Sequence, residues 1–182
     1  EATIRRDLSK LHRGGACVRI RGGARSFGST GPSAAEASAA GPGEVSLSAR
    51  SAQFRLEKTR IAETAAALCA DNELIFIDGG STTYQMHPFL LEKNLSVVTN
   101  SFAIARELSR SRSCSVILPG GIIYPESDII LNPFDNTFFG NFEAARVFMG
   151  AAAITSRGVE NRDTRIIQAE KAMIEHSKEL II

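Results

Sequence analysis

The stretch that most constrains the fold of this chain is a loop of small and hydroxyl residues at positions 78–83, with the sequence Asp-Gly-Gly-Ser-Thr-Thr. An apolar run at 74–77 precedes it, and a helix-like segment starts near Thr82. Such an order gathers backbone N–H groups and hydroxyls around one concavity, which suits a bound anion. Gly79 and Gly80 allow a tight turn and close approach of a ligand. An ordinary strand–helix turn with a Ser or Thr cap explains the same residues, so the stretch alone leaves both alternatives open.

Apolar runs alternate with helical periodicity from residue 55 onward. Strands are predicted over 73–77, 95–98, 115–118, 146–149 and 179–182, and helices over 55–70, 82–93, from Ser101, and over 164–177. The first helix is expected to bury Ile61, Ala65 and Leu68, and the second to be interrupted near Pro88. Ser101 is expected to cap the third helix. This alternation predicts an α/β fold with a parallel sheet and right-handed crossovers.

Small and hydroxyl residues follow three of the predicted strands, at 78–83, 99–101 and 119–121. Ligands of such sheets bind beyond the carboxyl ends of the strands. Because three loops of this kind converge at one edge, the sequence predicts a site for a small anionic molecule.

The N-terminal part of the chain is basic. Residues 1–25 hold seven Lys and Arg against two acidic residues, whereas the whole chain has a formal net charge of +1. Residues 3–13 predict a helix with an apolar stripe, and residues 17–21 predict a strand that turns at Gly22-Gly23 into a hairpin. This is the pattern of a recognition helix and wing, although a solvated helix with a surface hairpin fits equally well. Residues 28–49 read as a flexible linker, so the predicted parts are 1–27, 28–49 and 50–182.

The three cysteines, Cys17, Cys69 and Cys114, are widely spaced, which favours a reduced cytoplasmic setting. No apolar run has the length of a membrane span. The sequence shows no metal-ligand spacing, so neither a metal nor a cofactor is expected.

Residues 3–8, Thr-Ile-Arg-Arg-Asp-Leu, combined with residues 78–83, 98–101 and 148–150, carry a family resemblance. The chain resembles DeoR-type bacterial transcriptional repressors of sugar catabolism, truncated at both ends. The resemblance implies a Rossmann-like parallel sheet with flanking helices, similar to ribose-5-phosphate isomerase, glucosamine-6-phosphate deaminase and coenzyme A transferases. It also implies an N-terminal remnant of a winged helix-turn-helix. The protein is then expected to bind operator DNA and to release it when a phosphorylated sugar binds.

The resemblance implies two sets of site residues. The effector is expected to contact Asp78, Gly79, Gly80, Ser81, Thr82, Thr83, Thr99, Asn100, Gly120, Gly121, Glu170 and Lys171, with the phosphate held by the hydroxyls of 81–83. Glu170 stands where much of the family has a lysine. DNA is expected to contact Thr3, Arg5, Arg6, Lys10, Arg19 and Arg21.

A sugar-phosphate isomerase or deaminase is the alternative function. Its proton transfers need a base, for which Asp78, Glu126, Asp128 and Lys171 are the candidates. These residues lack the clustered acidic pattern of the isomerases, and His87 and His176 have no acidic partner nearby in sequence, so no catalytic residue is predicted.

Two expectations concern assembly and the ends of the chain. Reading a palindromic operator requires at least a dimer, so a homo-oligomer is expected. Residues 1–27 are not expected to form a stable DNA-binding domain by themselves, because an isolated helix of about a dozen residues is marginal in water. A sheet edge near Ile181-Ile182 is expected to be exposed.

Overall fold

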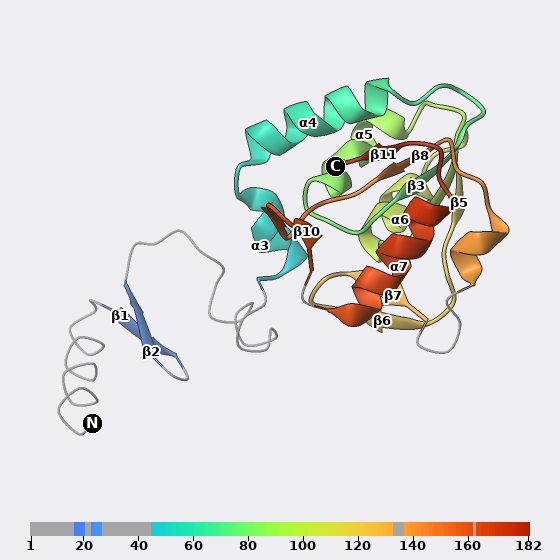
Figure 1. The fold of residues 1–182 in the computed structure, drawn as a ribbon. Helices are drawn as coiled ribbons and strands as arrows, with labels where there is room; N and C mark the ends of the chain where they lie inside the picture. Colours follow the sequence, from blue (N-terminus) through green and yellow to red (C-terminus); the bar gives the residue numbers. More distant parts are fainter. Residues whose placement is uncertain (1–16, 21–22, 27–44, 133–136, 162) are drawn as a thin grey trace. The chain divides into compact units, whose positions relative to one another are not determined.

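The computed structural model describes residues 17–20, 23–26, 45–132, 137–161 and 163–182 (Figure 1). The chain divides into two compact units, Glu1–Ala37 and Ser38–Ile182. In the first unit, strand β1 (Cys17–Ile20) pairs antiparallel with β2 (Gly23–Ser26), which confirms the predicted hairpin. The helix predicted over 3–13 lies outside the described residues.

A five-stranded sheet organises the second unit, in the order β11-β8-β3-β4-β5. Its strands are β3 (Leu74–Ile77), β4 (Ser96–Thr99), β5 (Ser115–Ile117), β8 (Arg146–Phe148) and β11 (Leu180–Ile181). Every pairing in it is parallel, so the predicted α/β fold is confirmed. Leu180 of the edge strand β11 and the following Ile182 are exposed.

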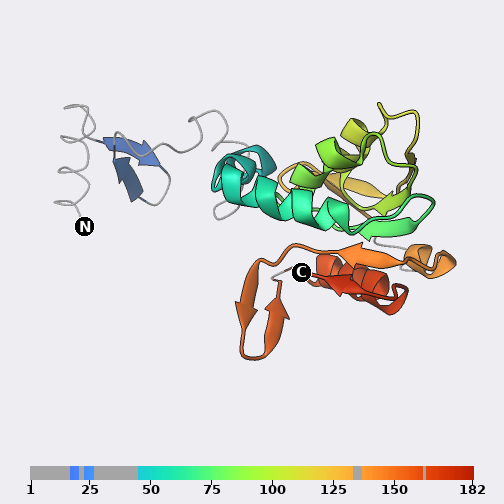
Figure 2. The same ribbon diagram turned by 90° about the horizontal axis from the view of Figure 1, so that it is seen from above.

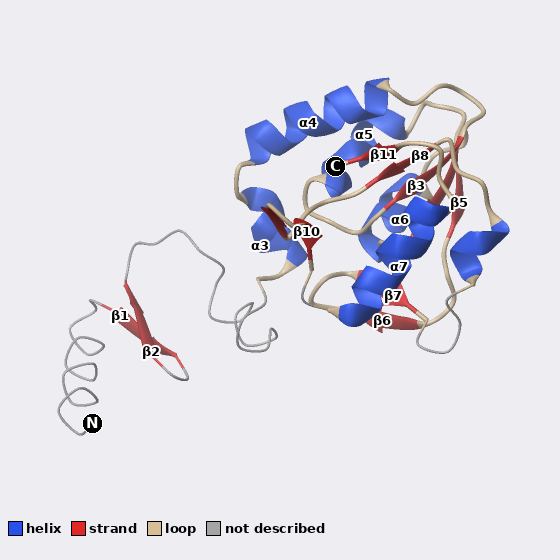
Figure 3. Ribbon diagram, viewed as in Figure 1, coloured by secondary structure: helices blue, strands red, loops and turns tan. Residues whose placement is uncertain are grey.

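Helices cover both faces of the sheet (Figures 2 and 3). Helices α4 (Arg55–Ala67), α5 (His87–Leu90) and α6 (Phe102–Leu108) pack on the face that presents Ile75, Ile77 and Val97. Helix α7 (Thr164–Glu175) and the 3₁₀ turn η2 (Phe138–Asn141) pack on the face that presents Phe76 and Val98. Since both faces are covered, the central strands read as continuous apolar runs.

Helix α4 buries a different face from the predicted one. Ile61 and Leu68 are 56% and 46% exposed, whereas Ala62, Ala65 and Ala66 are buried. The prediction from helical spacing is confirmed for Ala65 and is wrong for Ile61 and Leu68. The helix instead lies against the 3₁₀ turn η1 (Thr83–Met86), and the small alanine side chains allow this close approach.

The segment over 82–93 is broken, as predicted. The 3₁₀ turn η1 ends at Met86, and α5 follows with Pro88 in its first turn, where the missing N–H costs least. Ser101 caps α6, because its Oγ accepts a hydrogen bond from the Ile104 N–H at 3.2 Å. A short helix α3 (Leu47–Ala52) begins inside the range that the sequence assigned to a linker.

Two small hairpins were missed by the periodicity argument, because each strand has only three residues. The first pairs β6 (Ile122–Tyr124) with β7 (Ile129–Leu131), and the second pairs β9 (Ala153–Thr155) with β10 (Gly158–Glu160). Arg165 at the start of α7 donates to the Tyr124 hydroxyl at 2.7 Å and lies over its ring. This contact joins the first turn of α7 to β6.

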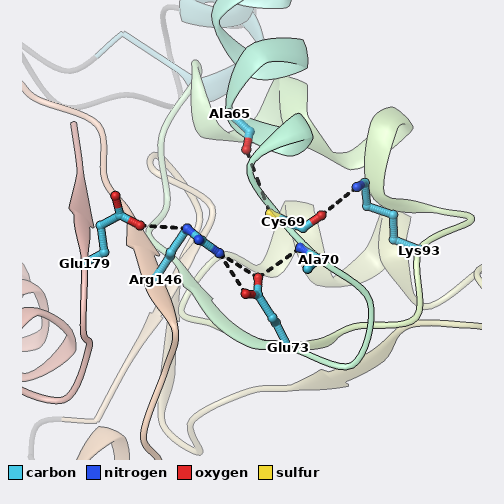
Figure 4. Close-up of polar contacts among 7 residues, drawn as sticks. All are labelled: Ala65, Cys69, Ala70, Glu73, Lys93, Arg146 and Glu179. Atoms are coloured by element: carbon cyan, nitrogen blue, oxygen red, sulfur yellow. Dashed lines mark hydrogen bonds and ion pairs between the residues drawn. The ribbon is translucent and has the colours of Figure 1, made fainter.

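Figure 4 shows the polar cluster at the amino ends of the strands. The Arg146 guanidinium on β8 donates to Glu73, just before β3, at 2.7 and 2.9 Å, and to Glu179, just before β11, at 2.8 Å. A backbone hydrogen bond from Ala70, together with Arg146, lowers the pKa of Glu73. Burial raises the pKa of the neighbouring Cys69 thiol to about 11, so this thiol stays protonated. The cluster fixes the register of three strands at the end opposite the predicted site.

Candidate effector site

The backbone that leaves β3 is tied to both neighbouring strands. The Asp78 N–H donates to the Phe148 carbonyl at 2.9 Å, and the Gly79 N–H donates to Asn100 Oδ1 at 2.8 Å. The Asn100 side-chain amide in turn donates to Asp78 Oδ1 at 2.8 Å. Asp78 and Asn100 therefore hold the ends of β3 and β4 together.

The Asp78 carboxyl is buried, with 3% of the residue exposed. Burial raises its pKa to about 7, and the nearby carboxylate of Glu170 acts in the same direction, against the hydrogen bond from Asn100. This carboxyl therefore changes its charge near neutral pH.

The β6–β7 hairpin is hydrogen-bonded to the segment that follows β4, and its Ile129 contacts the loop after β3. The Ile130 N–H donates to the Asn100 carbonyl at 2.7 Å, and the Phe102 N–H donates to the Asp128 carbonyl at 2.9 Å. A Cβ on Gly79 would lie 2.3 Å from Ile129 Cγ2, so any other residue at this position would force the Ile129 side chain or the backbone to shift. The hairpin thus forms one wall above the loop.

The hydroxyls of Thr83 and Thr99 are used inside the fold. Thr83 Oγ1 donates to the Asp78 carbonyl at 2.7 Å, and Thr99 Oγ1 donates to the Ile77 carbonyl at 2.5 Å. Both threonines are buried and neither lines the cavity described below. These two hydrogen bonds hold the backbone at the end of β3 and the start of the loop.

The loop opens onto a cavity of about 460 Å³, a size typical of small-molecule sites. The cavity gathers residues from α3, the loop after β3, the β6–β7 turn, the segment after β8, and α7. Its described lining comprises Val45, Arg50, Gln53, Asp78, Gly79, Gly80, Ser81, Thr82, Glu126, Ser127, Ile129, Gly150, Ala151, Ala152, Asn161, Ile166 and Glu170.

Residues 80–82 line this cavity, and several of their hydrogen-bond donors have no partner in the described part of the chain. The backbone N–H groups of Gly80, Ser81 and Thr82 make no hydrogen bond there, nor do the hydroxyls of Ser81 and Thr82. Successive N–H groups of this kind form a concave anion site. The segment that follows is only a four-residue 3₁₀ turn, so the N–H groups and hydroxyls, rather than a helix dipole, would attract an anion.

Acidic side chains lie elsewhere in the lining. Glu170 on α7 is 8% exposed, and Oε1 accepts a hydrogen bond from the Asn161 side chain at 3.0 Å. Burial raises the pKa of Glu170, and the bond from Asn161 opposes the shift. The neighbouring Lys171 is exposed and does not line the cavity.

Gly120 and Gly121 also lie outside the lining and start the β6–β7 hairpin. Gly121 has a φ of +149°, and a Cβ there would lie 2.3 Å from the Leu131 carbonyl oxygen. Close approach of the two strands therefore accounts for this glycine.

Comparison with known proteins places the chain in a family. Residues 53–182 match the family model for the DeoR C-terminal sensor domain, and residues 1–30 match the DeoR-like helix-turn-helix domain. The chain belongs to the DeoR family. The resemblance drawn from the sequence is thereby confirmed, and the chain is a transcriptional regulator with a helix-turn-helix region and a sensor domain.

Curated DeoR-family relatives align along nearly the whole chain. It is 29% identical to the HTH-type transcriptional regulator IolR of Bacillus subtilis (strain 168), over 99% of this chain and 68% of that protein. It is 30% identical to the HTH-type transcriptional repressor CsqR of Escherichia coli (strain K12), over 99% of this chain and 65% of that protein. The chain thus spans about two thirds of the length of these relatives.

Among solved structures, the chain is similar to ribose 5-phosphate isomerase A of Methanocaldococcus jannaschii. The two chains share 14% identity with a TM-score of 0.49, over 69% of this chain and 50% of the isomerase. Likeness at this level has no bearing on function.

Most of the residues predicted to contact DNA, namely Thr3, Arg5, Arg6, Lys10 and Arg21, lie outside the described residues. Arg19 lies on β1, opposite Ala24 of β2. Within the described part, no helix has the length and apolar character needed to span a bilayer, and no group of three or more His, Cys, Asp and Glu is arranged to hold a metal ion.

Sequence reasoning missed several cavity residues of this DeoR-family chain. Arg50 and Gln53 belong to or follow α3, close to the end of the predicted linker. Asn161 and the 150–152 segment flank the β9–β10 hairpin, which has no periodic signal. The sequence signal for α3 was the apolar Leu47 with Ser46, a common capping residue, directly before it. In the structure, the Ser46 hydroxyl accepts a hydrogen bond from the Ala49 N–H at 3.3 Å.

Proposed function

We propose that this DeoR-family chain is part of a repressor of a sugar-catabolic operon, and that its cavity binds a phosphorylated sugar as effector. The observation that carries the proposal is the set of donors at Gly80, Ser81 and Thr82 in the cavity lining that have no partner among the described residues. Three backbone N–H groups and two hydroxyls match the acceptor oxygens of a phosphate.

Arg50 adds a guanidinium to the same lining. Arginine suits phosphate because its planar fork donates two parallel hydrogen bonds. Glu170 lies in the same lining and offers carboxylate oxygens to the hydroxyls or other donors of the sugar. Thr83, Thr99 and Asn100 would then act by positioning the loop and would not touch the effector.

DNA binding is proposed for the region that matches the helix-turn-helix family, with Thr3, Arg5, Arg6, Lys10, Arg19 and Arg21 as contacts. Since two of the relatives are named repressors, repression is the expected output. The operator is expected to be palindromic and the regulator to be at least a dimer, acting in the cytoplasm.

A titration of thermal stability tests the effector proposal. Ribose 5-phosphate, glucose 6-phosphate, glucosamine 6-phosphate and inorganic phosphate are added to the whole chain and to Thr82→Glu. A ligand at a hundred times its Kd should add about 2.7 kcal/mol of apparent stability to the wild type. The shift should vanish in Thr82→Glu because of like charge, and persist in Ser113→Glu, which adds the same charge at an exposed position outside the cavity. An undiminished shift in Thr82→Glu would place the phosphate elsewhere.

We further propose that the cavity senses its ligand without transforming it. Of the four candidate bases, Asp128 and Lys171 lie outside the cavity lining, and the Asp78 carboxyl is buried against Asn100. Glu126 does line the cavity, so it is the candidate base if the protein is an enzyme. Robust turnover of ribose 5-phosphate or glucosamine 6-phosphate, lost in Glu126→Gln, would contradict this part of the proposal.

A further inference from the structure

We propose that the effector of this regulator is an amino-sugar phosphate, whose protonated amine pairs with Glu170 while its phosphate occupies the 80–82 loop. The inference rests on the proposed function, because it assumes that the loop holds a phosphate. It goes further by naming the group at the other end of the ligand.

The charge of the cavity lining is the first argument. Its described acidic members are Asp78, Glu126 and Glu170, and its described basic member is Arg50. A sugar phosphate without a cationic group brings further negative charge into this lining. A ligand with an amine brings a positive charge as well, which reduces the repulsion between its phosphate and the carboxylates.

The environment of Glu170 is the second argument. The residue is 8% exposed, and within the described part of the chain its carboxyl accepts one hydrogen bond, from Asn161 to Oε1. No Lys or Arg in that part forms an ion pair with it. A buried carboxylate without a charged partner is costly, and an ammonium group supplies both the missing charge and donors for the remaining lone pairs.

The proximity of a second carboxyl is the third argument. Glu170 and Asp78 are close enough for the charge of Glu170 to raise the pKa of Asp78. These side chains come from α7 and from the end of β3, on different walls of one cavity. A cation beside Glu170 offsets the repulsion between them, whereas a neutral hydroxyl leaves it in place.

The ligand chemistry follows from these contacts. A sugar alcohol or aldose phosphate would satisfy hydrogen bonds at Glu170 but not its charge. A sugar-acid phosphate would place a further carboxylate against Glu170 and should be rejected. An N-acetylated amine is neutral and should lose the preference as well.

Calorimetric titration of the whole chain at neutral pH tests the inference. The probes are glucosamine 6-phosphate and glucose 6-phosphate, which differ only in an amine or hydroxyl at one carbon, together with N-acetylglucosamine 6-phosphate. The amine should bind at least about tenfold more tightly than the hydroxyl, as expected for a desolvated charge-assisted contact. Glu170→Gln should bring the two affinities to within about threefold, since the charge is gone while the volume remains. Glu175→Gln, at an exposed position on the same helix, should keep the wild-type preference.

The outcomes separate this inference from the proposed function. Equal wild-type affinities for the amine and the hydroxyl, with binding abolished in Thr82→Glu, would overturn the amine assignment and leave the phosphate site intact. An amine preference unchanged in a folded Glu170→Gln would also overturn it. If no sugar phosphate binds, both proposals fail. The comparison of ligands on the wild type needs no variant, so the test stands even if Glu170→Gln does not fold.

Discussion

Gly79 shows how a single missing methyl group fixes the geometry of the cavity. A Cβ at this position would meet Ile129 Cγ2 at 2.3 Å. We expect Gly79→Ala to destabilise the fold by about 1–3 kcal/mol through overpacking. Gly120→Ala is the matched control, because nothing lies within 4 Å of its added Cβ. Denaturant unfolding measures both variants.

A double mutant tests whether Ile129 is the cause. Ile129 is 2% exposed, so Ile129→Ala alone should cost about 2–5 kcal/mol. In that background, however, Gly79→Ala should add less than it does in the wild type, because the clashing methyl group is gone. Simple additivity would show that backbone strain, not this contact, explains the glycine.

Asp78 predicts a pH dependence of stability. Its pKa is raised from 3.8 to about 7 in the folded chain, first by burial and then by Glu170. The folded state therefore binds more protons than the unfolded state between these values. The stabilising contribution is complete below the unfolded pKa and is lost as the pH rises through the folded pKa.

Asp78→Asn should remove this dependence. Relative to the variant, the free energy of unfolding of the wild type should fall by up to about 1.4 kcal/mol per pH unit between about pH 4 and 7. The amide oxygen can still accept the hydrogen bond from Asn100, so the loop is retained. Urea unfolding across this range provides the measurement, and Glu63→Gln, which removes an exposed carboxyl on α4, is the control. A difference that stays constant with pH would show that this carboxyl is ionised throughout.

Helix α4 provides a test of which face is packed. Ile61→Ala should change stability by less than about 0.5 kcal/mol, because the side chain is 56% exposed. Ala62→Leu, one residue further, should cost about 1–3 kcal/mol, because the residue is 1% exposed against η1. Thermal or denaturant unfolding measures the stability of both variants. A larger loss for Ile61→Ala than for Ala62→Leu would mean that the helix buries the stripe that the sequence predicted.

Some parts of this fold were predictable from the sequence, and others depend on tertiary contacts. Strands β3 and β4 were predictable because burial on both faces makes them continuous apolar runs between turn residues. The loop after β3 was predictable in part, since its glycines and hydroxyls are local signals. The role of Thr83 and Thr99 was not, because the carbonyls that they bond become neighbours only after the strands pair. The small-residue face of α4 and the three-residue strands of β6 and β7 carry no strong periodicity, so tertiary contacts decide them.

Residues near the start of the sensor unit contribute to the cavity lining. Arg50 and Val45 line the cavity from α3 and the residue stretch before it. Along the sequence, this stretch follows the region that matches the helix-turn-helix family. A phosphate held by both the 80–82 loop and Arg50 would join α3 to the sheet.

Hydrogen exchange of the α3 amides should therefore slow when an effector binds. A six-residue helix has little stability of its own, so its opening depends on contacts with the rest of the unit. At saturating glucosamine 6-phosphate, exchange at residues 47–52 should slow by about tenfold or more, the equivalent of about 1.4 kcal/mol. In Arg50→Gln at equal ligand saturation, this protection should be lost, because the link through the guanidinium is gone. Arg55→Gln, at an exposed position at the start of α4, should keep it. Protection that persists in Arg50→Gln would mean that closure of α3 depends on other cavity residues, and that Arg50 does not transmit occupancy toward the N-terminal region.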